Sequence, residues 1–346
     1  MHSTDNTTAA SPARVPKVAI IGTGSVGSSI AFACLMRSVA PELLLYDINT
    51  GFAHGQVLDL EDSVYLSSAN LASCSYDHDT PPQSTMTATA QDCGQADIIV
   101  VTAGFRQAPG ESRDELLSRN VFVLRDVFAR IAPIKSSAIV IMVTNPVNIM
   151  TWMAQKLSGL PPNQVFGTGT VLDTMRLRTA IKRTFREEGG DFEGFSENSI
   201  NAYVIGDHGD KQVALWSSAT VGGAPLTSFK PFEQLGTRVD VATKTTNRIY
   251  EIIKYKDASS FGIASIVVDL IQTILTNKQT VLPLTIYSER YNACIALPTV
   301  LSAKGVGSAI YPQMDTKEQA ALEAYVQDNR DTCAAILDFH CADREF

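Results

Sequence analysis

The sequence has few of the residues that build disulfide frameworks or metal sites. Its 346 residues include six cysteines and five histidines, and the cysteines form no CxxC pair and follow no regular spacing. This pattern is untypical of a disulfide-stapled fold and of a zinc site. The sequence therefore predicts reduced thiols in a cytoplasmic setting and no metal ion at the functional site.

The sequence also lacks a segment that could cross a membrane. It contains no run of roughly 18 apolar residues. The first 15 residues, MHSTDNTTAASPARV, are rich in serine and threonine and lack the apolar stretch of a secretory signal. We expect residues 1–15 to form a disordered tail, and we expect no membrane partner.

Positive charge is sparse along the chain. The formal net charge is −8, and Lys and Arg form no cluster that would outweigh it locally. A nucleic-acid-binding surface is therefore not expected. A small anionic substrate stays open, because a few arginines within a site can outweigh the charge of the whole molecule.

What the sequence does contain is the pattern of a parallel α/β protein. With 45% hydrophobic and 18% charged residues, it is long enough for two domains with a substantial core. Its first half alternates short apolar runs with helical patterns. Apolar residues at helical spacing predict a helix over 113–131, and a polar, proline-containing segment predicts a surface loop over 78–95. The expected buried strands cover residues 17–21, 42–47, 96–102 and 137–144.

The second half, which we place from Val165 onward, has a different pattern. A strand is expected over residues 199–206 and a long amphipathic helix over 260–277. The apolar face of this helix could lie in the core or at a contact between subunits. Residues 186–198 are polar and predict a second surface loop.

A glycine pattern follows the first expected strand. In VAIIGTGSVGSSIA, the glycines of a G-x-G-x-x-G pattern are Gly22, Gly24 and Gly27. Gly22 permits a tight turn, Gly24 lets the backbone approach a pyrophosphate, and Gly27 lets helix and strand pack closely. The phosphates would lie at the N-terminus of the helix that follows. A glycine turn without a ligand is the alternative, but the strand before the glycines and the helical pattern after them favour a dinucleotide site.

Asp47 ends the next expected strand. A carboxylate at that point can accept hydrogen bonds from the ribose hydroxyls of NAD and repels the 2′-phosphate of NADP. The sequence therefore predicts an α/β fold whose N-terminal Rossmann domain, a doubly wound parallel sheet over residues 16–164, binds NAD. Residues 165–346 are predicted to form a second domain, of α+β type.

Further motifs follow in order along the chain. They are TAGFRQAPGESR at 102–113, VTNPVNIM at 143–150, GTGTVLDTMRLR at 167–178 and GDHGD at 206–210. Together with the glycine pattern, they resemble the lactate/malate dehydrogenase family, and more closely its L-lactate branch, over most of the chain. The resemblance implies a homo-oligomeric, NAD-dependent enzyme that transfers a hydride reversibly between NADH and pyruvate, giving L-lactate. It also implies that residues 165–346 form the substrate and catalytic domain. The alternatives are malate dehydrogenase, a related 2-hydroxy-acid dehydrogenase, or a non-catalytic NAD-binding protein.

The resemblance assigns the proton chemistry to His208. Taken alone, a histidine in a glycine-containing turn is more often a loop residue that takes no part in any reaction. Among the family motifs, His208 matches the residue that gives a proton to the substrate carbonyl and takes it back in reverse, and an imidazole titrates near neutrality. Asp173 matches the carboxylate that fixes the imidazole tautomer and favours its charged form. Taken alone, Asp173 could be a helix cap or a surface acid.

Further residues are implied to hold the substrate and the cofactor. Arg176, on the same helix face as Asp173, matches the anchor for the substrate carboxylate, with a surface ion pair as the alternative. Arg113 matches the arginine of a mobile loop that polarises the carbonyl when the loop closes. Asn145 matches an amide that contacts substrate and cofactor, unless it is only a turn residue before Pro146. The implied cofactor residues are Gly22, Gly24, Ser25, Val26, Gly27, Asp47, Thr102, Ala103, Gly104 and Asn145.

Gln107 favours lactate over malate. It matches the loop position that faces the group beyond the keto carbon, where malate enzymes carry an arginine for the second carboxylate. A neutral glutamine leaves that charge unpaired, which is costly in a closed site, whereas the methyl of pyruvate needs no partner. Ser259 stands where lactate enzymes usually have threonine beside that methyl, so slightly longer 2-oxo acids are expected to fit. Asn201 replaces a histidine that many bacterial lactate enzymes use to bind fructose 1,6-bisphosphate, so activation by that sugar phosphate is not expected.

Overall fold

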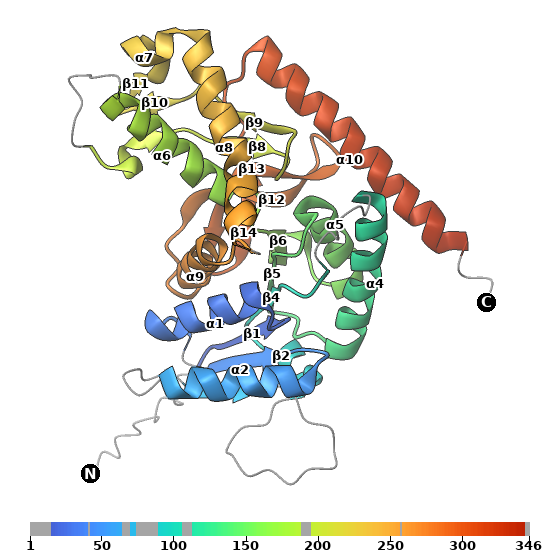
Figure 1. The fold of residues 1–346 in the computed structure, drawn as a ribbon. Helices are drawn as coiled ribbons and strands as arrows, with labels where there is room; N and C mark the ends of the chain where they lie inside the picture. Colours follow the sequence, from blue (N-terminus) through green and yellow to red (C-terminus); the bar gives the residue numbers. More distant parts are fainter. Residues whose placement is uncertain are drawn as a thin grey trace, which may run out of the picture.

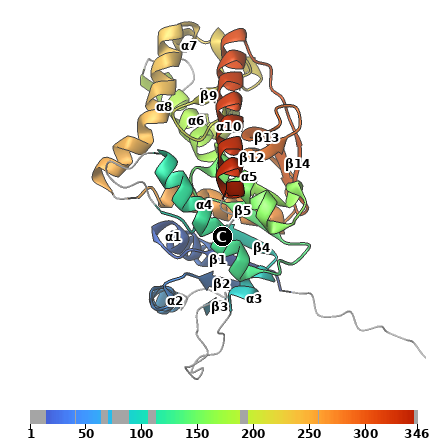
Figure 2. The same cartoon turned by 90° about the vertical axis from the view of Figure 1, so that its right-hand side faces the viewer.

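Figure 1 shows the computed structural model of the protein, which describes residues 15–40, 42–63, 70–73, 89–105, 113–187, 195–256 and 258–342. A large sheet runs through the molecule, with helices packed on both of its faces (Figures 1 and 2). Within these described ranges the large sheet has eleven strands, and a separate small sheet has three. The order of the strands determines where a ligand can bind.

The N-terminal part of the large sheet is parallel. Its strands follow the order β3-β2-β1-β4-β5-β6, and neighbours in this series pair in parallel. The strands are β1 (Lys17–Ile21), β2 (Glu42–Tyr46), β3 (Asn70–Ser73), β4 (Ile98–Val101), β5 (Ile139–Met142) and β6 (Val165–Gly167). The order reverses between β1 and β4, which is the point where doubly wound sheets bind ligands at the carboxyl ends of their strands. The predicted Rossmann architecture is confirmed.

Helices cover both faces of the parallel strands because successive residues in a strand point to opposite sides. Val18 and Ile20 face the core layer that includes α1, whereas Ala19 and Ile21 face the layer that includes α4 and α5. Burial on both faces accounts for the uninterrupted apolar runs of these strands. The helices are α1 (Ser25–Met36), α2 (Thr50–Ser63), α3 (Ala90–Gly94), α4 (Arg113–Ile131) and α5 (Val147–Ser158).

The surface loop predicted over residues 78–95 is wrong at its C-terminal end, where α3 forms. The N–H of Asp92 donates to the Thr89 hydroxyl, and the N–H of Thr89 donates to the Asp92 carboxylate. This reciprocal capping stabilises a helix that is too short to give a periodic signal, and the helix buries Cys93. Residues 78–88 of the predicted loop lie outside the described residues.

Antiparallel strands extend the sheet beyond β6. β6 pairs antiparallel with β12, and the order continues through β13, β8 and β9, with β14 beside β13. The C-terminal half is therefore a mixed α and β region joined edge to edge to the parallel strands. Its strands are β8 (Val204–Gly206), β9 (Gln212–Ala214), β12 (Thr280–Ser288), β13 (Ala293–Ser302) and β14 (Gly305–Ala309), and the small sheet holds β7 (Ile200–Asn201), β10 (Thr220–Val221) and β11 (Ala224–Pro225).

Two predictions for this half need correction. The strand predicted over 199–206 is divided, because β7 and β8 belong to different sheets. Between them, the carbonyl of Ala202 accepts a hydrogen bond from Nε of Arg178 at 3.1 Å, so a side chain replaces a neighbouring strand. The loop predicted over 186–198 is shorter, because α6 (Val171–Glu187) and a turn of 3₁₀ helix at Glu197–Ser199 take its ends. Residues 188–194 lie outside the described residues.

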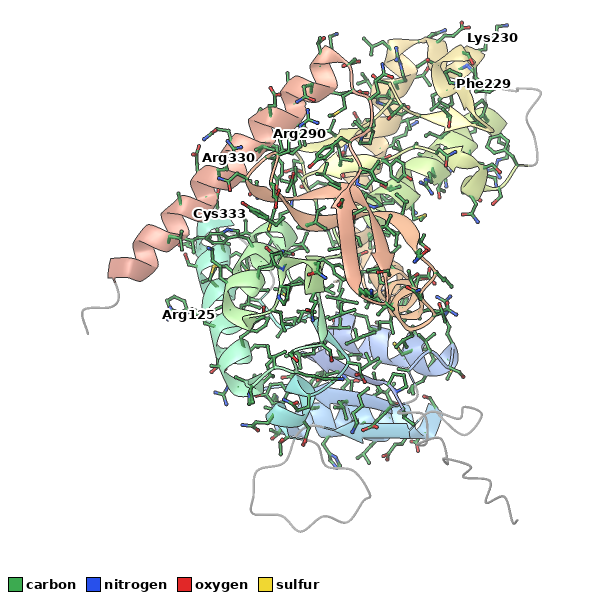
Figure 3. All side chains as sticks on the ribbon, turned by 180° about the vertical axis from the view of Figure 1, so that it is seen from behind. Arg125, Phe229, Lys230, Arg290, Arg330 and Cys333 are labelled. Atoms are coloured by element: carbon green, nitrogen blue, oxygen red, sulfur yellow. The ribbon has the colours of Figure 1, made fainter. Side chains whose placement is uncertain are left out.

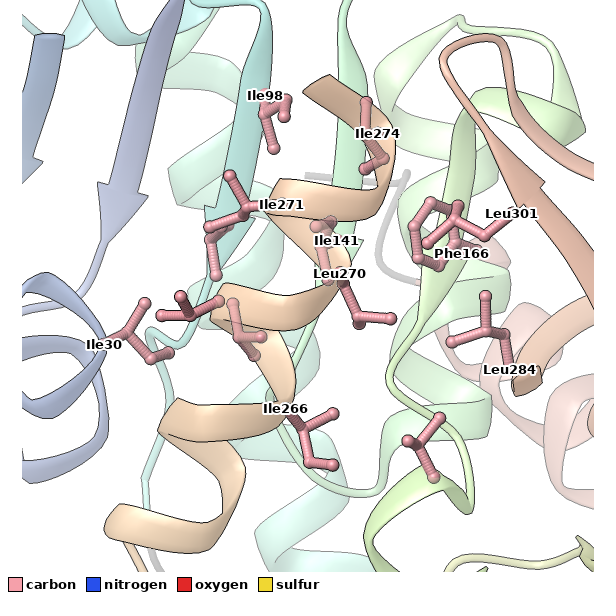
Figure 4. Close-up of a cluster of buried hydrophobic side chains, with 14 of the residues drawn as sticks. Ile30, Ile98, Ile141, Phe166, Ile266, Leu270, Ile271, Ile274, Leu284 and Leu301 are labelled. Atoms are coloured by element: carbon pink, nitrogen blue, oxygen red, sulfur yellow. The ribbon is translucent and has the colours of Figure 1, made fainter. Parts of the chain in front are cut away.

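Helix α9 (Phe261–Leu275) lies in the core of the molecule and confirms the helix predicted over 260–277. It packs against α1, and most of its isoleucine, leucine and valine side chains are buried. Its apolar face therefore belongs to the core rather than to a contact between subunits. Figure 4 shows its side chains between Ile30 and Ile98 on one side and Phe166, Leu284 and Leu301 on the other.

Two long helices enclose the antiparallel strands. α8 (Leu235–Tyr255), preceded by the short α7 (Lys230–Glu233), packs against α6, and α10 (Thr316–Ala342) crosses β13, β8 and β9 to reach α5 (Figures 1 and 2). Nε of Arg330 in α10 donates to the carbonyl of Tyr291 at 2.8 Å, which fixes α10 to the turn between β12 and β13. Figure 3 labels Arg330 on α10 and Arg290, a residue of this turn. Among the helices of the described ranges, none is both long and apolar enough to span a membrane.

Candidate active site

The turn between β1 and α1 carries the glycine pattern. Gly22 has a φ of +94°, and a Cβ there would lie 2.6 Å from the amide nitrogen of Ala103. A Cβ on Gly27 would lie 1.9 Å from the carbonyl oxygen of Gly22. Both positions therefore need glycine for the turn, the helix and the end of β4 to pack together. A Cβ on Gly24 would have no atom within 4 Å, so the backbone there faces open space.

This open backbone fits a phosphate-bearing ligand. Gly24 leads into the first turn of α1, which begins with Ser25 and Val26 and receives no side-chain cap from Gly24. Backbone N–H groups at a helix N-terminus bind anions, and the helix dipole favours negative charge there. The diphosphate of a dinucleotide matches both properties.

Asp47 lies beside this turn, directly after β2. Its Oδ2 accepts hydrogen bonds from the N–H of Thr23 at 2.8 Å and from the Thr23 hydroxyl at 3.2 Å. Its Oδ1 accepts one from the N–H of Asn49 at 2.9 Å. The residue is half-buried, and a carboxylate has about four lone-pair sites. Asp47 can therefore accept further hydrogen bonds from the hydroxyls of a ribose. The 2′-phosphate of NADP, in contrast, would be repelled by its negative charge.

The segments after β4 and β5 touch beside the glycine turn. The hydroxyl of Thr102 donates to the carbonyl of Gly22 at 2.7 Å. The hydroxyl of Thr144 donates to the carbonyl of Ala103 at 2.8 Å, and a Cβ on Gly104 would lie 2.5 Å from the Thr144 methyl. The carboxyl ends of β1, β4 and β5 are thereby held as one surface.

Helix α6 brings two predicted residues against the loop that follows β8. Asp173 lies in the first turn of α6, is 4% exposed, and has its Oδ2 2.6 Å from Nδ1 of His208. Nη1 of Arg176, one turn later, donates to Oδ1 of Asp173 at 3.2 Å. One buried carboxylate thus holds an imidazole and a guanidinium. Because Nδ1 is engaged, Nε2 of His208 is the nitrogen that can exchange a proton with a substrate.

Burial and neighbouring charges shift the pKa values of His208 and Asp173 in opposite directions. Burial lowers the pKa of His208, but the charge and hydrogen bond of Asp173, helped by the charge of Asp207, raise the pKa above its ordinary value of 6.5. Burial raises the pKa of Asp173, but His208 and Arg176 together bring that pKa below its ordinary value. Near neutral pH the cluster therefore favours an ionised Asp173 and a protonated His208.

Asn120, which sequence reasoning missed, joins two loops of the site. It lies in α4 and is 1% exposed; its Oδ1 accepts from the N–H of Phe105 at 2.7 Å and its Nδ2 donates to the carbonyl of Asn145 at 2.8 Å. It ties the segment after β4 to the predicted substrate amide. The sequence holds a signal for it, because Asn120 is a polar residue on the apolar helix face that includes Leu117 and Leu124.

The remaining predicted residues come from several separate segments of the chain. Asn145 follows β5 and is exposed, and Ser259 precedes α9 and is half-buried. Arg113 begins α4, but its side chain lies outside the described residues, as does all of Gln107. Asn201 is exposed in β7. Across the described ranges, no group of three or more His, Cys, Asp or Glu side chains could hold a metal ion.

Comparison with known proteins covers both halves of the chain. Residues 16–167 match the family model described as lactate/malate dehydrogenase, NAD binding domain, and residues 170–339 match the alpha/beta C-terminal domain of the same family. L-lactate dehydrogenase A of Rhizopus oryzae is 39% identical over 306 residues, covering 88% of this chain and 88% of that protein. L-lactate dehydrogenase of Bifidobacterium animalis subsp. lactis is 34% identical over 333 residues, covering 94% of this chain and 98% of that protein.

A solved structure has the same fold. The minor L-lactate dehydrogenase from Enterococcus mundtii, in its ligands-bound form, superposes with a TM-score of 0.82 at 31% sequence identity, covering 93% of this chain and 98% of that chain. The glycine turn and Asp47 fit a dinucleotide, and the family models include an NAD-binding domain. On these findings the protein belongs to the lactate/malate dehydrogenase family, with NAD as its cofactor.

Proposed function

We propose that this protein is an NAD-dependent L-lactate dehydrogenase, which reduces pyruvate to L-lactate with NADH and catalyses the reverse reaction. The observation that carries the proposal is the contact of one buried carboxylate, Asp173, with both His208 and Arg176. This contact combines a proton donor with a cation for a substrate carboxylate. The L-lactate dehydrogenases among the relatives support the same reaction.

In the proposed reaction His208 moves the proton. Asp173 holds Nδ1, so the protonated ring presents an Nε2–H that can donate to the carbonyl oxygen of pyruvate. That donor stabilises the negative charge that develops on the oxygen during reduction. In lactate oxidation the neutral imidazole accepts the hydroxyl proton at Nε2, and the nearby Asp173 stabilises the imidazolium that results.

Arg176 is the proposed anchor of the substrate carboxylate. Its side chain is 13% exposed, and Nη1 is 3.2 Å from Asp173, so the guanidinium is held in one orientation. The N–H groups not used by Asp173 can form a bidentate pair with a carboxylate. Asn145, after β5, and Arg113, at the start of α4, are proposed to contact the carbonyl oxygen.

NAD, when bound, supplies or accepts the hydride. We propose that it lies across the carboxyl ends of β1, β2 and β4, with its diphosphate at Gly24 and its ribose at Asp47, which favours NAD over NADP. In this arrangement residues 16–164 bind NAD and residues 165–346 carry most of the substrate chemistry. The proposed NAD contacts are Gly22, Gly24, Ser25, Val26, Gly27, Asp47, Thr102, Ala103, Gly104 and Asn145.

Gln107 is the basis for proposing pyruvate rather than oxaloacetate. As a neutral side chain beside the group beyond the keto carbon, it offers no charge to pair with a second carboxylate. The methyl of pyruvate needs no such partner. The small side chain of Ser259, proposed to lie beside that methyl, should also admit slightly longer 2-oxo acids.

We propose a cytoplasmic homo-oligomer as the working form. The cysteines with described side chains are buried free thiols, which suits a reducing setting. A contact between chains would cover large apolar side chains that are exposed on helix surfaces. Those on α1, α2 and α8 include Phe32, Met36, Phe52, Leu58, Leu235 and Val239.

The test follows NADH absorbance after addition of pyruvate, oxaloacetate or buffer alone. Pyruvate should give rapid oxidation of NADH, oxaloacetate should give much slower oxidation, and buffer should give none. In the reverse direction, NAD should be reduced with L-lactate and not with D-lactate. Faster turnover of oxaloacetate than of pyruvate would make malate dehydrogenase the better assignment, and turnover of neither would indicate a non-catalytic NAD-binding protein.

A further inference from the structure

A buried amide lies behind the loop that carries His208. Asn148 is in the first turn of α5 and is 3% exposed. Its Nδ2 donates to the carbonyl of Gly206 at 2.9 Å and to Oη of Tyr325 at 2.6 Å. Its Oδ1 accepts from the hydroxyl of Thr285 at 2.5 Å. The amide therefore connects α5 to β8, α10 and β12, and all of these groups are shielded from water.

The bond to Gly206 fixes the backbone just before the proposed proton donor. Gly206 ends β8 with a φ of +80°, and His208 follows two positions later. A Cβ on Gly206 would lie 3.0 Å from Cδ1 of Leu322, so α10 packs directly on this turn. The carbonyl of Gly206 and the packing of α10 together set the direction in which the chain leaves β8.

Tyr325 strengthens this connection. Its Oη accepts hydrogen bonds from Nδ2 of Asn148 and, at 3.4 Å, from Nδ2 of Asn329. Burial raises the pKa of Tyr325, and the nearby Asp207 carboxylate raises it further, so the hydroxyl stays neutral. A satisfied network of this kind holds its members rigidly in a low-dielectric interior.

The other end of the connection is the loop after β5. Asn145 lies just before Pro146, the N-cap of α5, and Asn148 lies in the first turn of that helix. The carbonyl of Asn145 is held by Asn120 at 2.8 Å. The loop of the proposed substrate amide and the loop of the proposed proton donor are thus joined through the first turn of α5.

We infer that Asn148 is a positioning residue for the reaction, which sets the distance between the His208 loop and the Asn145 loop through its bond to Gly206. The inference rests on the proposed function, because it assigns Asn148 a role in that chemistry. Reacting groups lose on the order of a hundredfold in rate when they are displaced by about 1 Å. Asn148 touches neither substrate nor cofactor and acts only through the two loops.

The test compares Asn148→Leu with Thr285→Val in the full-length protein. Leucine has the same number and branching of side-chain heavy atoms as asparagine but cannot donate to Gly206, whereas Thr285→Val removes only the bond to Oδ1 and leaves both donors of Asn148 in place. We expect kcat for pyruvate to fall about 10- to 100-fold in Asn148→Leu, with little change in KM or in the Kd for NADH. Thr285→Val should keep most of the wild-type kcat.

The pH profile separates a positioning role from a purely structural one. Asp173 and Asp207 raise the pKa of His208, and burial and Arg176 lower it. If the loop moves His208 away from Asp173, this pKa falls, so the loss of kcat/KM at high pH should move to lower pH in Asn148→Leu. A variant that only unfolds more easily would keep the wild-type profile in its folded fraction.

The possible outcomes distinguish a failure of the role inferred for Asn148 from a failure of the proposed function. Folded Asn148→Leu with the wild-type kcat and pH profile would overturn the inference while an active wild-type enzyme still supports the proposed function. A wild-type protein inactive on pyruvate overturns the proposed function, and the inference with it. If Asn148→Leu does not fold, Asn148→Ser keeps a polar group but is too short to reach Gly206, and it should show the same loss of kcat.

Discussion

Asp173 is the residue on which the proposed chemistry depends, because its two oxygens serve different functions. Oδ2 holds Nδ1 of His208 at 2.6 Å, and Oδ1 accepts from Arg176 at 3.2 Å. The position of the proton donor and that of the carboxylate anchor are therefore set by one side chain. A small movement of Asp173 would displace both groups at once.

The pH dependence of turnover should follow His208. Pyruvate reduction needs the protonated imidazole, so kcat/KM should be constant at low pH and fall as the pH rises through a pKa above 6.5. Lactate oxidation needs the neutral imidazole and should rise over the same interval. In Asp173→Asn the pKa of His208 loses its main source of increase, so the fall for pyruvate should move to lower pH. Rates measured from pH about 5 to 9 test this, and an unmoved curve would show that Asp173 does not set the charge of His208.

Substrate choice should change with Gln107→Arg. A guanidinium at this position can pair with the second carboxylate of oxaloacetate, and it would be left unpaired beside the methyl of pyruvate. Both effects act in the same direction, so the ratio of kcat/KM for oxaloacetate over pyruvate should rise by at least about a hundredfold. Gln107→Leu is the matched control, because it is neutral and should not raise the ratio. A change below about tenfold in Gln107→Arg would mean that Gln107 does not face the substrate.

For single residues, the sequence predicts the roles of side chains with distinctive chemistry better than it predicts the roles of buried amides. His208, Asp173 and Arg176 each lie in a motif, and the structure brings them into contact. Asn120 and Asn148 were not predicted, because their importance depends on which carbonyls lie opposite them. That is determined only when α4 and α5 pack against the loops.

Among the elements, α9 is one that joins the two halves of the molecule. Its side chains lie between α1 and β4 on one side and β6 and β12 on the other (Figure 4). Full burial of each large aliphatic side chain contributes about 1.5–3 kcal/mol. The stability of the nucleotide half and that of the substrate half are therefore coupled through this helix.

Replacing a buried side chain of α9 by alanine should destabilise the whole protein. Ile271 is 0% exposed, so Ile271→Ala should lower the free energy of unfolding by about 2–5 kcal/mol. Ser265→Ala, at an exposed position of the same helix, should change it by less than about 0.5 kcal/mol. Urea unfolding followed by circular dichroism measures both variants. Equal effects of the two substitutions would contradict the central place given to α9.

Elements with a clear period were predicted well, and those fixed by local contacts were not. The helix predicted over 113–131 has the bounds of α4, and the strand predicted over 17–21 has those of β1. Helix α3 was missed because it depends on the cap formed by Thr89 and Asp92 rather than on an apolar face. The strand over 199–206 was predicted as continuous, because nothing in its sequence shows that Arg178 takes the Ala202 carbonyl.

For the whole molecule, the sequence predicts the class of each half but not how the halves join. Alternating strands and helices indicated the parallel sheet, and its order confirms that prediction. The pairing of β6 with β12 could not be predicted, because residues far apart in sequence are brought together only by tertiary packing. This junction matters for function, since α6, with Asp173 and Arg176, follows directly after β6.

NAD is proposed to bind in the first half of the chain, and the proposed proton donor lies in the second half, so one variant should separate cofactor binding from proton transfer. His208→Asn removes the acid and base but leaves the glycine turn and Asp47 intact. The most direct measurement is the kcat for pyruvate reduction in His208→Asn and the wild type, together with the Kd for NADH from fluorescence titration. We predict that kcat falls by about 10² to 10⁴ while the Kd for NADH stays near the wild-type value. A variant that turns over pyruvate at the wild-type rate would contradict the account, because His208 would then not be the group that moves the proton.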